Sequence, residues 1–365
     1  GRLSVSQTDN SITFALKPVK GLSGAYDVAS PSTSPVSPDL TATQSLIAGS
    51  NRTITIIKAP FSGGQFKYGV DLAPEAMLAQ EYNLAASLED LGWTGLHITA
   101  IDCQNPTVGP DNLLVPVERF GKVINPTLVS DCTRNLNAAC KEARSKPNNF
   151  SLILGGDHSI AIGSISGIIE GTGGDVGVIW VDAHTDINVP QTSQSGKLHG
   201  CPVSFLLGME RPAELPGFDW LRPCLKPHQI AYIGCRDIDP EEKETVKELG
   251  ISVFTMKEVV QHGIENVITM ALNIVNPTNE LPIHLSFDID ALDPHDAPST
   301  GTPVRGGLSL REGRRICERL HETGRLVSMD MVEVNPELGD KGRDPHLTVD
   351  AAVHLIRAAL GDKLL

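Results

Sequence analysis

The chain has 365 residues, enough for one large domain or two smaller ones with a substantial buried core. Its 44 Asp and Glu residues exceed its 30 Lys and Arg residues, and this gives a net charge of -14. Because no basic cluster stands out, nucleic acid and anionic membrane surfaces are not expected partners. No apolar run approaches the ~20 residues of a transmembrane helix, so no membrane association is expected.

The first 52 residues differ in pattern from the rest. Ser, Thr and Pro recur there, most densely over 31–38, and neither a helical nor a strand period is sustained. We therefore expect a flexible N-terminal extension over 1–52 and a single α/β domain over 53–365. Acidic residues are sparse in the extension, which leaves an organelle-targeting remnant as an alternative.

From Thr53 onward, apolar strand patterns alternate with amphipathic helical patterns. The expected strands are 53–59, 96–101, 151–155, 176–182, 229–234, 251–255, 282–288 and 325–333. The expected helices are 74–91, 127–145, 240–249, 257–275, 309–322 and 345–360. Eight strands separated by helices predict one parallel sheet with helices on both faces. The pattern does not choose between an open sheet and a closed barrel.

The seven cysteines form no CxxC pair, and several fall within core-like patterns. This usage predicts reduced thiols and a reducing compartment, either the cytoplasm or, as an alternative, the mitochondrial matrix.

Aspartate and histidine residues follow three of the apolar strand patterns. Side chains two apart on an extended segment point to the same face, and the carboxyl ends of parallel strands lie side by side. The sequence therefore predicts that six side chains meet at one sheet edge. These are His158, Asp182, His184, Asp186, Asp288 and Asp290.

Four carboxylates balance the charge of two divalent cations. Oxygen donors outnumber nitrogen donors and no thiol takes part, which favours manganese or magnesium over structural zinc, although cobalt, iron or zinc could use the same groups. A lone Asp-x-Asp is usually a turn or a cap, and a lone His behind a strand is usually a packing residue. Three such clusters in one chain favour a two-metal site.

Further polar residues follow the same strands. Glu333 ends the last strand, and the loop after Asp186 contains Asn188, Ser193, Ser195 and His199. His199 is either a packing residue or a proton shuttle, and a two-metal hydrolase favours the second role. Asp239 either caps the next helix or faces the site.

From about Ile54 to its C-terminus the chain resembles the arginases of the ureohydrolase family. The motifs that carry this resemblance are Gly155–Ser159, Trp180–Asn188, Ser195–Gly200, Ser286–Asp290 and Met331–Pro336. The resemblance implies an arginase/deacetylase-like sheet and two Mn²⁺ ions per subunit. One ion would be held by His158, Asp182, Asp186 and Asp288, and the other by His184, Asp182, Asp288 and Asp290.

The same resemblance implies hydrolysis of L-arginine to L-ornithine and urea, with a hydroxide shared by the two ions as the nucleophile. The expected catalytic residues are Glu333, which orients the guanidinium, His199, which shuttles a proton, and Asp186. The residues expected to bind the substrate are Asn188, Ser193, Ser195, Asp239, Glu242 and Thr302.

The resemblance also implies a homotrimer, in which Arg311 and Glu312 match an interface pair, although a surface charge pair on a helix would look the same. Two rival functions remain open. The chain could act on agmatine or another guanidino compound, or it could be a catalytically silent metal-binding or arginine-binding protein.

Overall fold

The computed structural model describes residues 4–8, 11–15, 45–47, 51–191, 193–209 and 214–363. The chain forms two compact units, Gly1–Ala42 and Thr43–Leu365. The first unit contains an antiparallel hairpin of β1 (Ser4–Thr8) and β2 (Ser11–Ala15). The sequence pattern did not indicate this hairpin. Most of the remaining expected extension lies outside the described residues.

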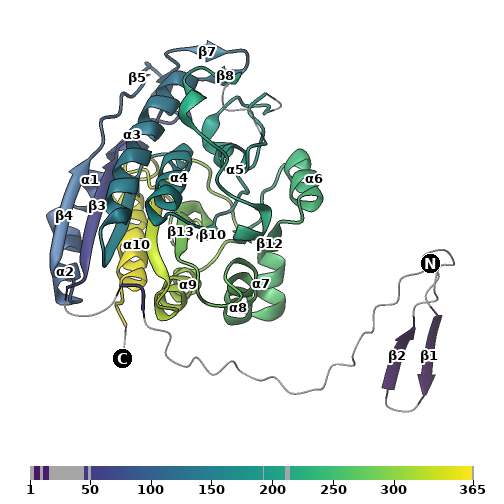
Figure 1. The fold of residues 1–365 in the computed structure, drawn as a ribbon. Coiled ribbons are helices and arrows are strands. Elements are labelled where there is room, and N and C mark those ends of the chain that lie inside the picture. Colours follow the sequence, from purple (N-terminus) through teal and green to yellow (C-terminus); the bar gives the residue numbers. More distant parts are fainter. Residues whose placement is uncertain are drawn as a thin grey trace. The chain divides into compact units, whose positions relative to one another are not determined.

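The second unit is built on an eight-stranded sheet, drawn in Figure 1. In chain order its strands are β3 (Thr53–Ala59), β4 (Gly95–Ala100), β9 (Asn149–Gly155), β10 (Gly177–Val181), β11 (Ile230–Cys235), β12 (Ser252–Thr255), β13 (Ile283–Asp288) and β14 (Leu326–Val332). In space their order is β12-β11-β10-β13-β14-β9-β3-β4, and every pair is parallel. The expected parallel sheet is confirmed, and within the described residues it is open, with β12 and β4 at its edges.

Helices cover both faces of this sheet, as expected. They are α1 (Ala73–Met77), α2 (Leu84–Asp90), α3 (Pro126–Ser145), α4 (Ala161–Thr172), α5 (Pro202–Leu207), α6 (Pro240–Glu248), α7 (Met256–His262), α8 (Ile264–Val275), α9 (Leu310–Glu322) and α10 (Asp344–Ala359). Along β10 the side chains alternate: Ile179 and Val181 pack with α8, α9 and α10, whereas Val178 and Trp180 pack with α4 and α5. This alternation is why the strand is apolar throughout.

Short antiparallel pairs lie outside the sheet, between β4 and α3. They are β5 (Thr107–Val108) with β6 (Leu114–Val115), and β7 (Arg119–Phe120) with β8 (Val123–Ile124). The second pair holds the loop that follows the Asp186 cluster, because the Ile124 N–H donates to the Gly196 carbonyl at 3.0 Å.

Helix α4 was not among the expected helices. It is buried on nearly all sides and rich in glycine, so it has neither a polar face nor a strong helix propensity. Its glycines have a packing reason: a Cβ at Gly163 would stand 2.2 Å from the Thr133 carbonyl of α3, and one at Gly167 would stand 2.4 Å from the Asn137 carbonyl. The two helices therefore approach closely and lie together against the sheet in Figure 1.

The expected helix 257–275 is two helices, α7 and α8, separated at Gly263 with φ +74°. The expectation that every cysteine is reduced is wrong for one pair. Cys103, in the loop after β4, and Cys132, on α3, form a disulfide with a Cα–Cα distance of 5.0 Å. They are 29 residues apart, so only the fold brings them together. Among the described residues, Cys140, Cys201, Cys224, Cys235 and Cys317 form no disulfide. Among the described residues, no helix is long and apolar enough to cross a bilayer.

Candidate metal centre and substrate cleft

The predicted site residues meet at the carboxyl ends of four neighbouring strands. His158 begins a short turn after β9, Asp182 directly follows β10, Asp288 ends β13, and Glu333 directly follows β14. The parallel register places Asp288 opposite Val332, the residue before Glu333. The strand ends therefore bring together side chains that are up to 175 positions apart in the sequence.

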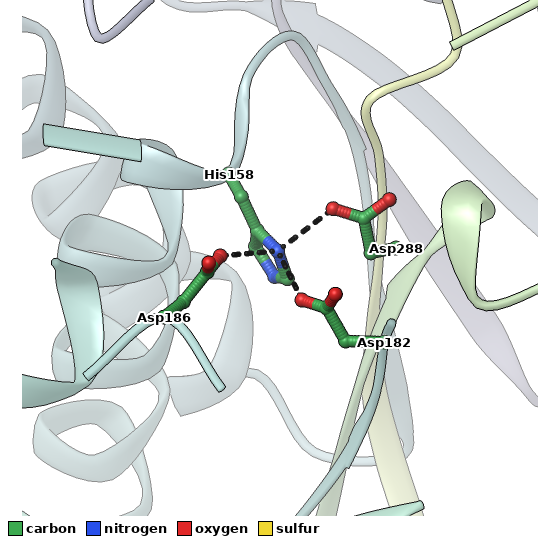
Figure 2. A group of neighbouring side chains, drawn as sticks. All are labelled: His158, Asp182, Asp186 and Asp288. Atoms are coloured by element: carbon green, nitrogen blue, oxygen red, sulfur yellow. Dashed lines mark hydrogen bonds and ion pairs between the residues drawn. The ribbon is translucent and has the colours of Figure 1, made fainter. Parts of the chain in front are cut away.

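Three carboxylates surround one imidazole nitrogen, as Figure 2 shows. The His158 Nδ1 atom lies 3.2 Å from Asp182 Oδ2, 3.2 Å from Asp186 Oδ2 and 3.1 Å from Asp288 Oδ2. A single N–H cannot donate well to three acceptors, whereas one nitrogen and three oxygens around a common point form a ligand set for a cation.

A second group shares Asp182 with the first. The His184 Nδ1 atom lies 3.3 Å from Asp182 Oδ1 and 3.2 Å from Asp290 Oδ2. Asp182 thus presents one carboxylate oxygen to each group, which is the geometry of a bridging ligand. Asp288 belongs to the first group by these distances, and its expected contact with a second ion stays a prediction.

Buried hydrogen bonds fix the orientation of these ligands. The Trp180 indole donates to Asp182 Oδ2 at 2.9 Å, and the Thr302 hydroxyl donates to Asp290 Oδ2 at 2.9 Å. The other ring nitrogen of His158, Nε2, lies 2.9 Å from the Ser286 hydroxyl, and its ring stacks on Trp180 with centroids 4.1 Å apart. Metal-binding histidines commonly use their second nitrogen in this way.

The site concentrates negative charge away from water. Burial, with the charges of Asp290 and Asp182 adding to it, raises the pKa of Asp288 well above its usual range. Burial and the charge of Asp182 raise the pKa of Asp186 to about 6, against the opposing effect of His158. Bound cations would relieve both penalties, and a donor set rich in carboxylate oxygen fits hard or borderline divalent ions.

Glu333 connects the ligand groups to His199. Its Oε1 atom accepts the His158 backbone N–H at 2.9 Å and lies 3.0 Å from His199 Nδ1. Burial acts to raise the Glu333 pKa, but the hydrogen bond and charge of His199 outweigh it and hold the pKa below its usual value. Glu333 and Asp186 both have left-handed backbones, with φ of 62° and 45°.

A cleft opens beside the two ligand groups. It is lined by His184, Asp186, Asn188, His199, Gly200, Asp237, Asp239, Glu242, Asp288 and Thr302. Six of the nine side chains predicted to bind substrate or act in catalysis therefore line one cleft, namely His199, Asp186, Asn188, Asp239, Glu242 and Thr302.

Ser193 and Ser195 belong to the loop between Asn188 and His199. Their hydroxyl oxygens are 3.4 Å apart, and they accept the backbone N–H groups of Gly196 and Lys197 at 3.2 and 3.3 Å. The loop thus holds two hydroxyl groups side by side.

Asp239 takes part in the cap of α6 and also lines the cleft, and Glu242, which was expected only to bind the substrate, does the same. The Asp239 N–H donates to Glu242 Oε2 at 3.1 Å in a capping box at the start of α6, and the Ile187 N–H donates to Glu242 Oε1 at 3.0 Å. Both residues also line the cleft, where the Asn188 amide donates to Asp239 Oδ2 at 3.3 Å. Burial, followed by the charge of Asp186, raises the pKa of Glu242 to about 7.

Three residues of the site were not predicted from the sequence. Trp180 and Ser286 hold metal-site residues in place, and Asp237 lines the cleft. The same alternation that identified the ligands could have found two of them. Trp180 precedes Asp182 by two positions, and Ser286 precedes Asp288 by two, so each pair shares a face of its strand.

Comparisons with known proteins agree with this fold and give a family. The family model described as "Arginase family" matches residues 52–361. The arginase of Glaciozyma antarctica is 47% identical over 320 residues, covering 86% of this chain and 89% of that protein. The arginase of Neurospora crassa is 48% identical over 331 residues, covering 86% and 87%.

Solved structures give the same result. The Bacillus caldovelox arginase superposes with a TM-score of 0.74 at 35% identity, covering 86% of this chain and 100% of that one. The cold-adapted arginase of Glaciozyma antarctica superposes with a TM-score of 0.67 at 41% identity, covering 88% and 98%. Because the family model matches most of the chain and the Glaciozyma antarctica and Neurospora crassa relatives are 47% and 48% identical to it over 86% of its length, the chain belongs to the arginase family.

Proposed function

We propose that this protein is an arginase, which hydrolyses L-arginine to L-ornithine and urea with two Mn²⁺ ions bound. The observation that carries the proposal is the sharing of Asp182 between two ligand groups beside the Glu333–His199 pair. His158, Asp182, Asp186 and Asp288 would hold one ion, and Asp182, His184 and Asp290 the other, with Asp288 also expected to contact the second ion. When bound, the two cations supply the Lewis acidity that makes water nucleophilic at neutral pH.

Glu333 is suited to orient the guanidinium. Its Oε1 atom accepts the hydrogen bonds of His158 and His199, and its Oε2 atom lies beside Gly301, where an added Cβ would come into contact with it at 3.4 Å. A depressed pKa keeps Glu333 ionised, as a partner of a cationic substrate must be. Carboxylate and guanidinium groups pair through charge-assisted hydrogen bonds that fix orientation as well as position.

His199 is suited to move a proton. The interaction of its Nδ1 atom with Glu333 holds the ring and leaves Nε2 for exchange at the reacting centre. Although burial lowers its pKa, the hydrogen bond and charge of Glu333 raise the pKa above the ordinary value. A protonated imidazole can then donate to the departing amine, which is a poor leaving group without a proton.

The remaining cleft residues suit an amino acid more than a simple amine. The hydroxyls of Ser193 and Ser195 and the amide of Asn188 can donate to a carboxylate, while Asp239 and Glu242 can accept from an ammonium group. This pairing of donors with acceptors favours L-arginine over agmatine, which has no carboxylate. Thr302 acts through Asp290, to which its hydroxyl donates.

The decisive experiment combines metal analysis with a urea assay. Protein stripped with a chelator would be reloaded with Mn²⁺, Co²⁺, Zn²⁺ or Mg²⁺, and urea release would be measured from L-arginine, agmatine and a guanidino acid without an α-amino group. We expect two Mn²⁺ per chain and a clear preference for L-arginine. Urea from agmatine at an equal rate would favour the rival substrate. No urea from fully loaded protein would favour a catalytically silent binding protein.

We further propose that the protein is a homotrimer. Glu312 accepts the Ser309 hydroxyl at 2.8 Å in the capping box of α9 and so already has a role within the chain. Arg311, its neighbour on the same helix, is exposed and can reach a partner subunit. Light scattering coupled to gel filtration would give the mass directly, and a monomer mass would contradict the proposal.

A further inference from the structure

Arg236 has an unusual set of partners for a charged side chain. It follows β11 directly, and its guanidinium makes six hydrogen bonds, all of them to backbone carbonyls. The shortest two run from Nη2 to the carbonyls of Asp290 and Val304, each at 2.7 Å. The others reach Gly234, Ala291, Leu292 and, through Nε, Val304 again, at 3.1 to 3.2 Å.

Five of these six bonds go to two segments that both control Asp290, and the sixth goes to Gly234 on β11. The first contains Asp290 itself and the two residues after it. The second ends at Val304, two positions beyond Thr302, whose hydroxyl donates to Asp290 Oδ2 at 2.9 Å. One guanidinium therefore fixes both the backbone of Asp290 and the loop that orients its carboxylate.

The backbone of Arg236 holds the opposite side of the same ligand group. Its N–H donates to the Ala183 carbonyl at 2.8 Å, and the Ala183 N–H in turn donates to Asp290 Oδ1 at 3.2 Å. Ala183 lies between the ligands Asp182 and His184. Arg236 therefore stands at the junction of the segments that supply the group of Asp182, His184 and Asp290.

The other ligand group has supports of its own. His158 is held by Ser286 at 2.9 Å and by Glu333 at 2.9 Å, and Asp182 is held by Trp180 at 2.9 Å. None of these three contacts involves the guanidinium of Arg236. Moving that guanidinium should disturb one ligand group far more than the other.

We propose that Arg236 is the positioning residue for the second of the two cations, the one held by Asp182, His184 and Asp290. The inference rests on the proposed function, which requires two ions. It adds that different residues hold the ligands of each ion in place. The positive charge of the guanidinium repels a nearby cation and would weaken its binding. Its favourable effect must therefore come from the geometry of its hydrogen bonds. A planar fork with five N–H donors can reach carbonyls on two segments at once, which an ammonium group cannot do.

The test measures bound Mn²⁺ per chain and the electron paramagnetic resonance signal, which distinguishes a coupled ion pair from a single ion. The variants are Arg236→Lys, which keeps the charge and loses the fork, and Arg236→Ala, to which ethylguanidine is added as a replacement guanidinium. We expect both variants to retain one ion, to bind the second at least 10-fold more weakly and to lose the coupled signal. Ethylguanidine should restore the second ion in Arg236→Ala.

Arg325→Lys serves as the matched control, because Arg325 is also largely buried, at 6% exposed, but lies at the other end of β14, just before the strand begins. It should bind two ions like the wild type. Two ions of normal affinity in either folded Arg236 variant would overturn the proposal, and so would loss of both ions together. If neither variant folds, Thr302→Val is the test, because it removes the hydroxyl through which the loop held by Arg236 orients Asp290. An unchanged affinity for the second ion in that variant would overturn the proposal. A wild type that binds no ions would instead refute the proposed function.

Discussion

His199 Nδ1 and Glu333 Oε1 lie 3.0 Å apart, and the same oxygen accepts the backbone N–H of His158. The residue proposed to move a proton, the residue proposed to hold the guanidinium and a proposed metal ligand are thus joined through one carboxylate. A substitution at any of the three can shift the other two, so each experiment must measure metal binding and turnover separately.

His199→Ala should retain both ions and lose turnover. The substitution leaves every proposed metal ligand in place but removes the proton donor for the departing amine. Such donors contribute roughly 10²-fold or more to the rate. Metal content and the pH profile of kcat would be compared with wild type. The matched control is His97→Ala, because His97 is an exposed histidine on the edge strand β4. An unchanged kcat across the pH range would remove His199 from the mechanism.

Asp182→Ala should empty both cation positions, because its two carboxylate oxygens face the two ligand groups separately. Elemental analysis of the purified variant should find less than one ion per chain and no measurable urea production. Asp219→Ala, at a carboxylate whose side chain is 85% exposed, provides the control and should bind two ions. Normal metal content in the Asp182 variant would contradict a bridging role.

Ser195→Ala should weaken the use of L-arginine more than that of agmatine. A hydroxyl that donates to a substrate carboxylate contributes about 1.5 kcal/mol or more, so KM for L-arginine should rise by roughly 10-fold. Agmatine lacks the carboxylate and should be nearly unaffected. The ratio of kcat/KM values for the two substrates is the measurement, and an equal loss for both would show that Ser195 lies elsewhere relative to the bound substrate.

His321 should make stability depend on pH on the acid side. Burial lowers its pKa below the usual 6.5 and outweighs the hydrogen bond to the Ala359 carbonyl, with the nearby charges of Lys363 and Arg52 adding to the effect. The folded protein therefore binds fewer protons than the unfolded chain. Well above pH 6.5 the ring is neutral in both the folded and the unfolded state, so His321 does not change the free energy of unfolding. As the pH falls below 6.5 toward the pKa of the folded state, the unfolded chain takes up the proton first and stability is lost.

Urea unfolding at about pH 7.5 and about pH 5.5, on either side of the ordinary histidine pKa, tests this expectation. His321→Gln keeps a polar side chain that does not ionise. The variant should therefore lose less stability than wild type when the pH falls from the higher to the lower value. An equal loss in both proteins would show that other groups cause the acid effect. The difference between the two pH values is the quantity to compare, because the substitution itself can shift stability at every pH.

The strands could be predicted from the sequence because those buried on both faces are nearly continuous apolar runs. The range 53–59 matches β3 at both ends, and the other strands of the sheet agree to within two residues at either end. The predicted ligands also meet, because alternation along a strand and alignment of parallel strand ends are strong geometric rules.

Other features depend on neighbours that the sequence does not reveal. Helix α4 lacks a polar face because α3 and the sheet enclose it. The Cys103–Cys132 disulfide and the contacts of Arg236 join segments that only the tertiary structure brings together. A lone arginine after a strand is usually a surface residue by pattern, so its six carbonyl partners could not be inferred.

The spatial order of the strands has a consequence for how the protein folds. The ligands follow β9, β10 and β13, yet β14, which is late in the chain, lies between β13 and β9. The group of His158, Asp182, Asp186 and Asp288 cannot be complete until β14 has inserted between β13 and β9, so a cation in that group cannot template an early intermediate. A cation that binds there only after β14 is in place should slow unfolding and leave the folding rate almost unchanged.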